Sequence, residues 1–276
     1  MLRFLEPRGN DVDSLYERVS RGTYDKPFIV DSWPWRFLHF DFESVQSAML
    51  MHDPDKLCFA YTRKMMMFLL FNQTPARILL LGLGGGSLAK FCYRNLERSV
   101  LTAVEINPTI IALREEFRIP ADDERFRIVR ADALRYVSDL PCSKDVMLVD
   151  ACDRHGVAPQ LDCIAFYQNA YRGLSAGGVF VANLCGAWKS CVSHLDKIAQ
   201  VFGDNLLALH VRATRNLIVF AFKEPRECFD WADLETKALA LKPRLRMDLR
   251  KYVRRMALAS KLRTWQKAID LSERRI

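Results

Sequence analysis

Residues 77–105 constrain the fold most, because a short apolar run there leads into four glycines within five residues. The run at residues 77–82 is typical of a buried parallel strand that ends in a turn. The glycines let the backbone bend tightly and let a ligand approach where a Cβ would clash; they are Gly82, Gly84, Gly85 and Gly86. Residues 87–94 then favour a helix whose first N–H groups face that ligand.

A second strand, residues 101–105, ends in Glu105, about 20 residues beyond the glycines. A carboxylate at this spacing binds ribose hydroxyls in nucleoside-binding α/β folds. We therefore interpret residues 77–105 as a nucleoside site. The turn lacks the Lys-Ser/Thr ending of a P-loop, but NAD-type binding stays open because the spacing is close to G-x-G-x-x-G. A glycine turn that binds no ligand is the remaining alternative.

Strand-like and helix-like segments alternate beyond Glu105. The predicted strands are 125–130, 146–150 and 179–183, the predicted helices are 109–117, 132–137, 166–174 and 188–202, and 206–211 with 217–222 form an antiparallel pair. This alternation predicts a mostly parallel sheet whose ligands bind at the carboxyl ends of the strands. The residues that follow such ends should converge on one cleft; they are Gly84, Glu105, Asp132, Asp150 and Asp153.

A chain of 276 residues can bury a full core, and one large α/β domain with small additions at either end is the simplest division. We predict an N-terminal segment (1–57), a Rossmann-like nucleoside-binding domain (58–223) and a basic helical extension (224–276). The N-terminal segment should form a small antiparallel sheet; its strands are 27–32, 36–41 and 44–49. Residues 59–71 predict an apolar helix buried against the first parallel strand.

The C-terminal extension carries most of the net charge of +8, with 14 Lys and Arg against 8 Asp and Glu in residues 224–276. Residues 242–256 predict one basic helix with apolar residues, followed by the basic segment 261–267. Such a face could bind nucleic acid, an acidic partner or an acidic membrane surface. The favoured alternative is an amphipathic helix packed on the domain or on a second subunit.

The charged first residues and the short longest apolar run, residues 65–71, predict neither a signal peptide nor a membrane span, so we expect a soluble cytoplasmic protein. The eight cysteines include no C-x-x-C pair and predict reduced, mostly buried thiols; they are Cys58, Cys92, Cys142, Cys152, Cys163, Cys185, Cys191 and Cys228. The five scattered histidines include no H-x-x-x-H pair, and we predict no metal site.

Taken together, several of these motifs resemble the spermidine synthase family, the polyamine aminopropyltransferases, within the class I S-adenosylmethionine-dependent fold. The resemblance covers roughly residues 27–222 and is carried by LLLGLGGGSL, VEINP, FRIVRADALRYV, DVMLVDACD and FYQNAYRGLSAGGVFVANL. It implies a seven-stranded sheet, decarboxylated S-adenosylmethionine or S-adenosylmethionine as co-substrate, a small amine acceptor, and a homo-oligomer such as a homodimer.

The resemblance also implies roles for single residues. Glu105 would hold the ribose hydroxyls, and Asp132 with Ala133 would meet the adenine edge. Asp153 would deprotonate or orient the acceptor amine, because an amine must lose its proton to become nucleophilic, and Asp150 would lie beside the acceptor. Gln46 and Tyr61 would line the space between donor and acceptor. A turn-forming role for Asp153 and buried structural roles for Tyr61 and Gln46 stay open.

Three departures from the family distinguish this chain. Gly85 stands where the family usually has an Asp that binds the amino group of the donor's aminopropyl arm. Residues 154–156, Arg-His-Gly, replace the usual proline, and Thr62-Arg63 follow Tyr61 in place of His or Gln and then Glu. The site is therefore less acidic than a polycation requires.

Two reactions follow from this comparison. Whole-chain resemblance favours aminopropyl transfer narrowly, whereas methyl transfer from intact S-adenosylmethionine accounts for Gly85, which removes repulsion against the donor's carboxylate. A third hypothesis is a nucleoside-binding or nucleic-acid-binding module without catalysis.

Overall fold

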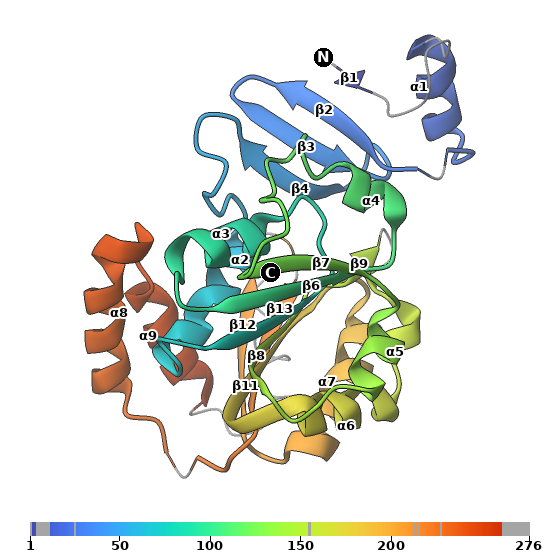
Figure 1. Cartoon of the computed structure of the whole chain (residues 1–276). Helices are drawn as coiled ribbons and strands as arrows, with labels where there is room; N and C mark the ends of the chain where they lie inside the picture. The colour runs from blue at the N-terminus through green and yellow to red at the C-terminus, as the bar shows by residue number, and fades with distance from the viewer. Residues whose placement is uncertain are drawn as a thin grey trace.

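A seven-stranded sheet forms the centre of the molecule in the order β12-β13-β11-β8-β5-β6-β7 (Figure 1). The computed structural model describes residues 2–3, 12–24, 26–153, 156–211, 214, 216–226 and 228–260. The strands are β5 (Arg77–Leu81), β6 (Val100–Glu105), β7 (Phe126–Arg130), β8 (Lys144–Val149), β11 (Leu174–Leu184), β12 (Leu206–Val211) and β13 (Asn216–Phe222).

Strands β7, β6, β5, β8 and β11 pair in parallel, whereas β13 is antiparallel to both of its neighbours, β11 and β12. The predicted α/β class, with a mostly parallel seven-stranded sheet, is confirmed. The last strand in the sequence, β13, lies between β11 and β12, so the edge strand β12 pairs with the sheet through β13.

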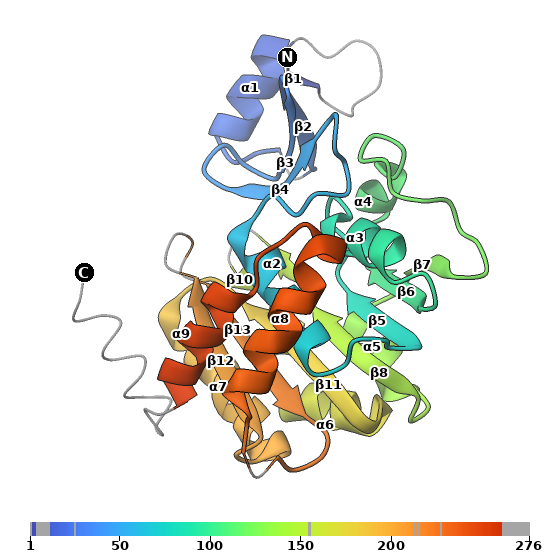
Figure 2. The ribbon, with the colours of Figure 1, turned by 90° about the vertical axis from the view of Figure 1, so that its left-hand side faces the viewer.

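Helices cover both faces of this sheet (Figures 1 and 2). One layer contains α2 (Ala60–Met65), the 3₁₀ helix η1 (Met66–Leu70), α3 (Ser87–Asn95), α8 (Trp231–Leu245) and α9 (Arg250–Ser260); the other contains α5 (Ala133–Ser138), α6 (Ile164–Gly173) and α7 (Trp188–Phe202). Alternate residues of a strand point to opposite faces. Accordingly, Ile78 and Leu80 belong to one buried cluster, and Leu79 and Leu81 to the other.

The predicted N-terminal cap is a four-stranded antiparallel sheet in the order β1-β2-β3-β4, and Figure 2 shows it above the main sheet. Its strands are β1 (Leu2–Arg3), β2 (Phe28–Ser32), β3 (Trp35–His39) and β4 (Val45–Leu50), and α1 (Val12–Ser20) lies between β1 and β2 in the sequence. Arg36 joins this cap to the main domain, because its guanidinium donates to Asp31 and also to the backbone carbonyl and carboxylate of Glu116, each at 2.7 Å. These charge-assisted hydrogen bonds hold the cap against the segment that contains Glu116.

Two predicted helices differ from the structure near the centre of the chain. Residues 59–71 are buried as expected, but the helix tightens from α2 into η1 at Met66, and α2 packs against β11, β12 and β13. The helix expected at residues 109–117 is α4 (Pro108–Ala112), which begins at the predicted cap, where Asn107 accepts from the backbone N–H of Thr109. Beyond Ala112 the chain continues in hydrogen-bonded turns that bury Leu113 and Phe117.

The single basic helix predicted at residues 242–256 is wrong. The chain turns at Arg246, whose φ of 50° is left-handed, so α8 ends at Leu245 and α9 begins at Arg250. This turn lets both helices bury apolar residues on the same sheet face; those of α9 are Tyr252, Val253 and Met256.

The favoured alternative, an amphipathic helix packed on the domain, therefore holds for α9. The segment 261–267 lies outside the described residues, and nucleic-acid binding by the basic extension stays a prediction that salt-sensitive retention on RNA or DNA would test. Across the described parts of the chain, each helix is too short or too polar to cross a bilayer.

Candidate functional site

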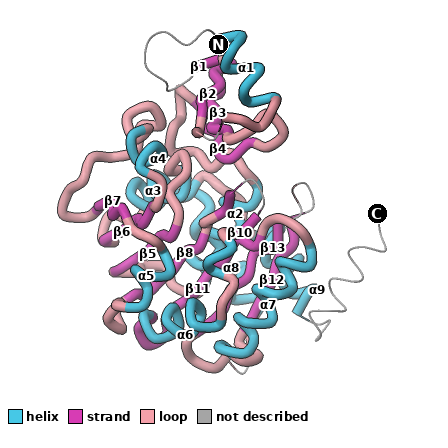
Figure 3. The backbone as a smooth tube through the Cα atoms, turned by 90° about the vertical axis from the view of Figure 1, so that its right-hand side faces the viewer, coloured by secondary structure: helices cyan, strands magenta, loops and turns pink. Residues whose placement is uncertain are grey.

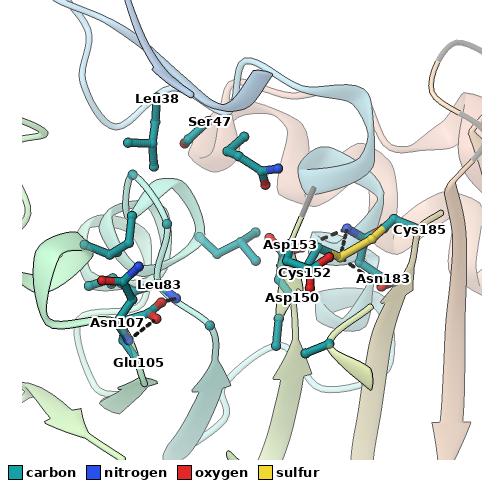
Figure 4. A pocket seen from close by; sticks show the side chains of 18 of the residues that line it. Leu38, Ser47, Leu83, Glu105, Asn107, Asp150, Cys152, Asp153, Asn183 and Cys185 are labelled. Atoms are coloured by element: carbon teal, nitrogen blue, oxygen red, sulfur yellow. Dashed lines mark hydrogen bonds between the residues drawn. A yellow bond between two sulfur atoms is a disulfide. The ribbon is translucent and has the colours of Figure 1, made fainter. Parts of the chain in front are cut away.

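A cavity of about 860 Å³ lies between strand β4 of the N-terminal cap and the carboxyl ends of β5, β6, β8 and β11. Figure 4 shows Glu105 and Leu83 on one side of it, Asp150 and Asp153 on the other, and Ser47 above. The structure brings most of the predicted site residues together here; the lining includes Gln46, Tyr61, Gly82, Gly84, Gly85, Glu105, Ala133, Asp150 and Asp153. Gly86 and Asp132 lie outside this lining.

The glycine turn joins β5 to α3 by close backbone contacts. A Cβ on Gly82 would lie 2.3 Å from the backbone oxygen of Asp150, so the ends of β5 and β8 meet without a side chain between them. Gly86 begins α3 with a φ of 69°, and a Cβ there would lie 2.4 Å from Ile119. Gly86 therefore allows the left-handed turn and the close contact with Ile119, whereas Gly84 and Gly85 line the cavity.

Glu105 is held at the end of β6 by backbone donors on both sides. Its Oε2 atom accepts from the N–H of Leu83 at 2.9 Å, and its Oε1 atom accepts from the N–H of Asn107 at 2.8 Å. These bonds tie the carboxylate to the glycine turn and fix its orientation. Each oxygen has a further lone pair that can accept from a hydroxyl, which is the arrangement that a ribose needs.

Asp132 has a structural partner of its own. It is the N-cap of α5, and its Oδ1 atom accepts from the backbone N–H of Arg135 at 3.0 Å. The flanking residues Ala131 and Ala133 line the cavity, whereas Asp132 does not. Contact of Asp132 with an adenine edge stays a prediction.

Asp150 is the centre of a hydrogen-bond network that crosses three elements. Its Oδ1 atom accepts from Nδ2 of Asn183 at 2.8 Å, and its Oδ2 atom accepts from the hydroxyl of Tyr61 at 3.3 Å. Asn183 in turn accepts from Nδ2 of Asn216 at 2.8 Å. Both amides are buried, with 3% and 7% of their surfaces exposed, so the network fixes which way the Asp150 carboxylate faces.

Burial raises the pKa of Asp150, and the hydrogen bonds from Asn183 and Tyr61 oppose that rise. Burial also raises the pKa of Tyr61 well above its usual range, with the Asp150 carboxylate adding to the effect. Tyr61 therefore remains a phenol and a hydrogen-bond donor at neutral pH.

Asn183 and Asn216 are site residues that the sequence did not reveal as such. Asn183 is a polar residue near the carboxyl end of a predicted strand, and this position could have marked it as a site residue. Asn216 lies in a predicted turn before a strand, and nothing in the sequence indicates that this turn lies beside Asp150.

Asp153 lies in a small hairpin formed by β9 (Cys152–Asp153) and β10 (Gly156–Val157), which precedes the 3₁₀ helix η2 (Pro159–Leu161). Its Oδ1 atom accepts from the backbone N–H of Gly156 at 3.1 Å. The turn-forming alternative therefore describes part of its role, and its carboxylate still faces the cavity (Figure 4).

The prediction of reduced, mostly buried thiols is wrong for several cysteines. Cys152 and Cys185 form a disulfide in the cavity wall. They are 33 residues apart in sequence but follow the neighbouring strands β8 and β11, a proximity that spacing alone does not reveal. Of the free thiols, Cys92 and Cys191 are buried, whereas Cys142 and Cys228 are exposed. In the described residues, no three His, Cys, Asp or Glu side chains form a group that could hold a metal ion.

Comparison with known proteins gives concordant results. The spermine/spermidine synthase domain matches residues 58–205. The polyamine aminopropyltransferase of Chromobacterium violaceum is 36% identical over 222 residues, covering 80% of this chain and 85% of that protein.

Two solved structures share the fold. Human methyltransferase-like protein 13 in complex with SAH is 26% identical with a TM-score of 0.62, over 69% of this chain and 94% of that one. A probable spermidine synthase from Corynebacterium glutamicum is 21% identical with a TM-score of 0.65, over 78% of this chain and 85% of that one. The domain match covers more than half of the sequence and the Chromobacterium relative most of it, so this chain belongs to the spermine/spermidine synthase family of transferases.

Proposed function

We propose that this chain transfers the aminopropyl group of decarboxylated S-adenosylmethionine to a small amine, with Asp153 as the base. The observation that carries the proposal is that Glu105 lies on one side of the cavity, which we assign to the nucleoside, and Asp150 and Asp153 lie on the other, which we assign to the acceptor (Figure 4). The name of the Chromobacterium relative, polyamine aminopropyltransferase, supports the same reaction.

The nucleoside side fits a donor of this kind. The volume of about 860 Å³ is within the range of cavities that hold small molecules. The oriented carboxylate of Glu105 would accept from the ribose hydroxyls, and the open space beside Gly84 leaves room for the donor's sulfonium end. Gln46 and Tyr61 would line the space between the donor and the acceptor.

The acceptor side supplies a proton acceptor. An acceptor ammonium gives a proton to the Asp153 carboxylate and becomes a nucleophilic amine. Its lone pair attacks the propyl carbon next to the sulfonium, the C–S bond breaks, and the bonding electrons leave with sulfur as methylthioadenosine. Asp150, fixed by Asn183 and Tyr61, would hold the cationic acceptor in line with that carbon.

Calorimetric titration tests the donor first. The purified chain is titrated side by side with S-adenosylmethionine, its decarboxylated form and methylthioadenosine. We expect the decarboxylated donor to bind more tightly than the intact one, and methylthioadenosine to bind as the product. Diamines incubated with decarboxylated donor should then release methylthioadenosine, which mass spectrometry detects. Tighter binding of the intact donor contradicts aminopropyl transfer.

Methyl transfer from intact S-adenosylmethionine is the second candidate, and Gly85 is the observation that favours it. The family's usual acid is absent there, so nothing at that position repels a donor carboxylate. Human methyltransferase-like protein 13 was solved with SAH, the product of methyl transfer. Under this candidate, the intact donor binds more tightly and incubation with the correct acceptor releases SAH in place of methylthioadenosine. The homo-oligomer expected from the family is a separate proposal, which light scattering would check.

A further inference from the structure

The disulfide between Cys152 and Cys185 lies in the wall of the cavity, beside both acceptor-side carboxylates. Cys152 stands between Asp150 and Asp153 in the sequence, and Cys185 follows directly after β11. Both cysteines line the cavity (Figure 4). Nothing in the proposed transfer reaction uses either sulfur.

Backbone hydrogen bonds of the described residues join the segment that carries Asp153 to the ends of β8 and β11. The N–H of Val157 donates to the carbonyl of Cys185 at 3.3 Å, and that of Ala158 donates to Ala151 at 2.9 Å. Gly156 forms an isolated β-bridge with Gly186, and a Cβ on Gly156 would lie 2.7 Å from the carbonyl of Cys185. Val157 of the hairpin is buried in the core cluster on this face of the sheet, and the covalent bond between Cys152 and Cys185 is the strongest single attachment of the hairpin to the end of β11.

We propose that Cys152 and Cys185 form a reversible redox site, in which the disulfide positions Asp153 for reaction and its reduction loosens the hairpin. A dithiol reductant supplies two electrons and two protons: its thiolate attacks one sulfur, the Cys152–Cys185 bond breaks, and the reductant leaves as its own disulfide. Both cysteines are then thiols. The backbone bonds at Val157 and Ala158 remain, so the hairpin stays attached but less firmly oriented.

The effect on activity rests on the proposed function of Asp153, whereas the redox site itself does not. Displacing the base by a fraction of an ångström should slow the transfer step. It should not weaken donor binding, because we assign the donor to the opposite side of the cavity, around Glu105. Reduction should therefore lower kcat by about tenfold and leave the affinity for the donor nucleoside unchanged.

The first experiment establishes the bond. The full chain, purified in air and alkylated without reductant, is digested and analysed by mass spectrometry. We expect a linked peptide pair containing Cys152 and Cys185 that disappears after treatment with dithiothreitol. A chain in which both cysteines are fully alkylated before reduction overturns the proposal.

The second experiment measures the consequence in the same preparation. Hydrogen exchange of the backbone amides in residues 151–158 should become faster on reduction, while that of the turn at residues 82–86 stays unchanged. Transfer activity should fall on reduction and recover on reoxidation. Unchanged exchange and unchanged activity in the two states overturn the positioning role.

Variants separate this site from the other thiols. The double substitution Cys152→Ser and Cys185→Ser should abolish the response to dithiothreitol, with kcat lowered as in the reduced chain. Cys228→Ser, at an exposed thiol outside the cavity lining, should keep the full response. A double variant whose exchange and kcat match the oxidised chain contradicts the proposal. If no donor is turned over in any state, the proposed function fails, and the exchange measurement still decides whether the redox site exists.

Discussion

Ser47 of the N-terminal cap occupies the space beside Gly85 that a side chain would need. A Cβ on Gly85 would lie 2.6 Å from the Oγ atom of Ser47 and 2.9 Å from Phe117. The Ser47 hydroxyl also lies 3.3 Å from that of Ser87 at the start of α3. Ser47 of β4 thus fills the space that an acidic side chain at position 85 would occupy. An Asp could be introduced there only if the Ser47 side chain moved or were made smaller.

We expect Gly85→Ala to destabilise the chain by about 1–3 kcal/mol, because a methyl group at this position overpacks the contact between the cap and α3. Urea unfolding measures the loss. Ser47→Gly introduced together with Gly85→Ala should recover part of it, and the single Ser47→Gly variant completes the double-mutant cycle. Strictly additive effects of the two substitutions would show that the contact is not the cause.

Asn183→Ala should move the acid limb of the kcat/KM profile to higher pH. Burial raises the pKa of Asp150, and the hydrogen bond from Asn183 opposes that rise, so removing the donor raises the pKa further. Because the acceptor side needs the ionised carboxylate, activity should fall off at a higher pH than in the wild type. The measurement is kcat/KM from pH 5 to pH 9.

Asn216→Ala is a milder variant for the same measurement, because Asn216 acts on Asp150 only indirectly, through its hydrogen bond to Asn183. It should shift the acid limb in the same direction by a smaller amount. A profile that stays in place for Asn183→Ala would mean that Asp150 does not limit the rate.

Asp153→Asn should lower kcat by at least about 10²-fold and leave the donor affinity intact, because the amide cannot accept the acceptor's proton. Single-turnover release of methylthioadenosine measures the rate, and calorimetry measures the affinity. Asn can still accept the hydrogen bond from Gly156, so the hairpin should persist. Wild-type turnover by this variant would remove Asp153 from the mechanism.

Lys90 should make stability depend on pH in the alkaline range. Burial lowers the pKa of Lys90 to about 8, while its ammonium donates to the carbonyl of Phe117 at 2.7 Å. The unfolded chain therefore binds this proton more tightly between pH 8 and about pH 10.4, and stability rises with pH through that window. Below pH 8 the full cost of the buried charge is present.

The measurement compares the wild type with Lys90→Met by urea unfolding at pH 8 and pH 10. The wild type should gain about 2 kcal/mol relative to the variant over this interval. Lys56→Met, at an exposed lysine, should keep the wild-type difference. An equal gain in Lys90→Met would assign the pH dependence to other groups.

Local patterns predicted the parallel strands, the glycine turn and Glu105, because each depends on a few consecutive residues. The cavity gathers Gln46 and Tyr61 with these residues, as the family resemblance implied. The contact between Asn183 and Asn216 could not be predicted, because it depends on the register between strands that are distant in the sequence. Asn183 is opposite Ile218 in the antiparallel pair of β11 and β13, and only this pairing brings Asn216 within reach of it.

The prediction of reduced thiols failed for Cys152 and Cys185 for a related reason, since these cysteines follow strands that are neighbours in the sheet but not in the sequence. The break of the basic extension at Arg246 depends on what α8 and α9 pack against. Both helices pack on one face of the sheet, with α9 against β12 (Figure 3), a tertiary arrangement that the charge pattern alone does not encode.

The position of β13 has a consequence for how the chain is made. During synthesis β12 emerges before the strand with which it pairs, and β11 presents an open edge until β13 fills it. An unpaired edge can join to another chain. A nascent chain that stops before Asn216 already holds the glycine turn, Glu105 and both acceptor-side carboxylates, but it lacks the amide that completes the network. During synthesis, the acceptor side therefore cannot complete its network until β13 has emerged, and the edge of β11 stays open to mispairing over the same interval.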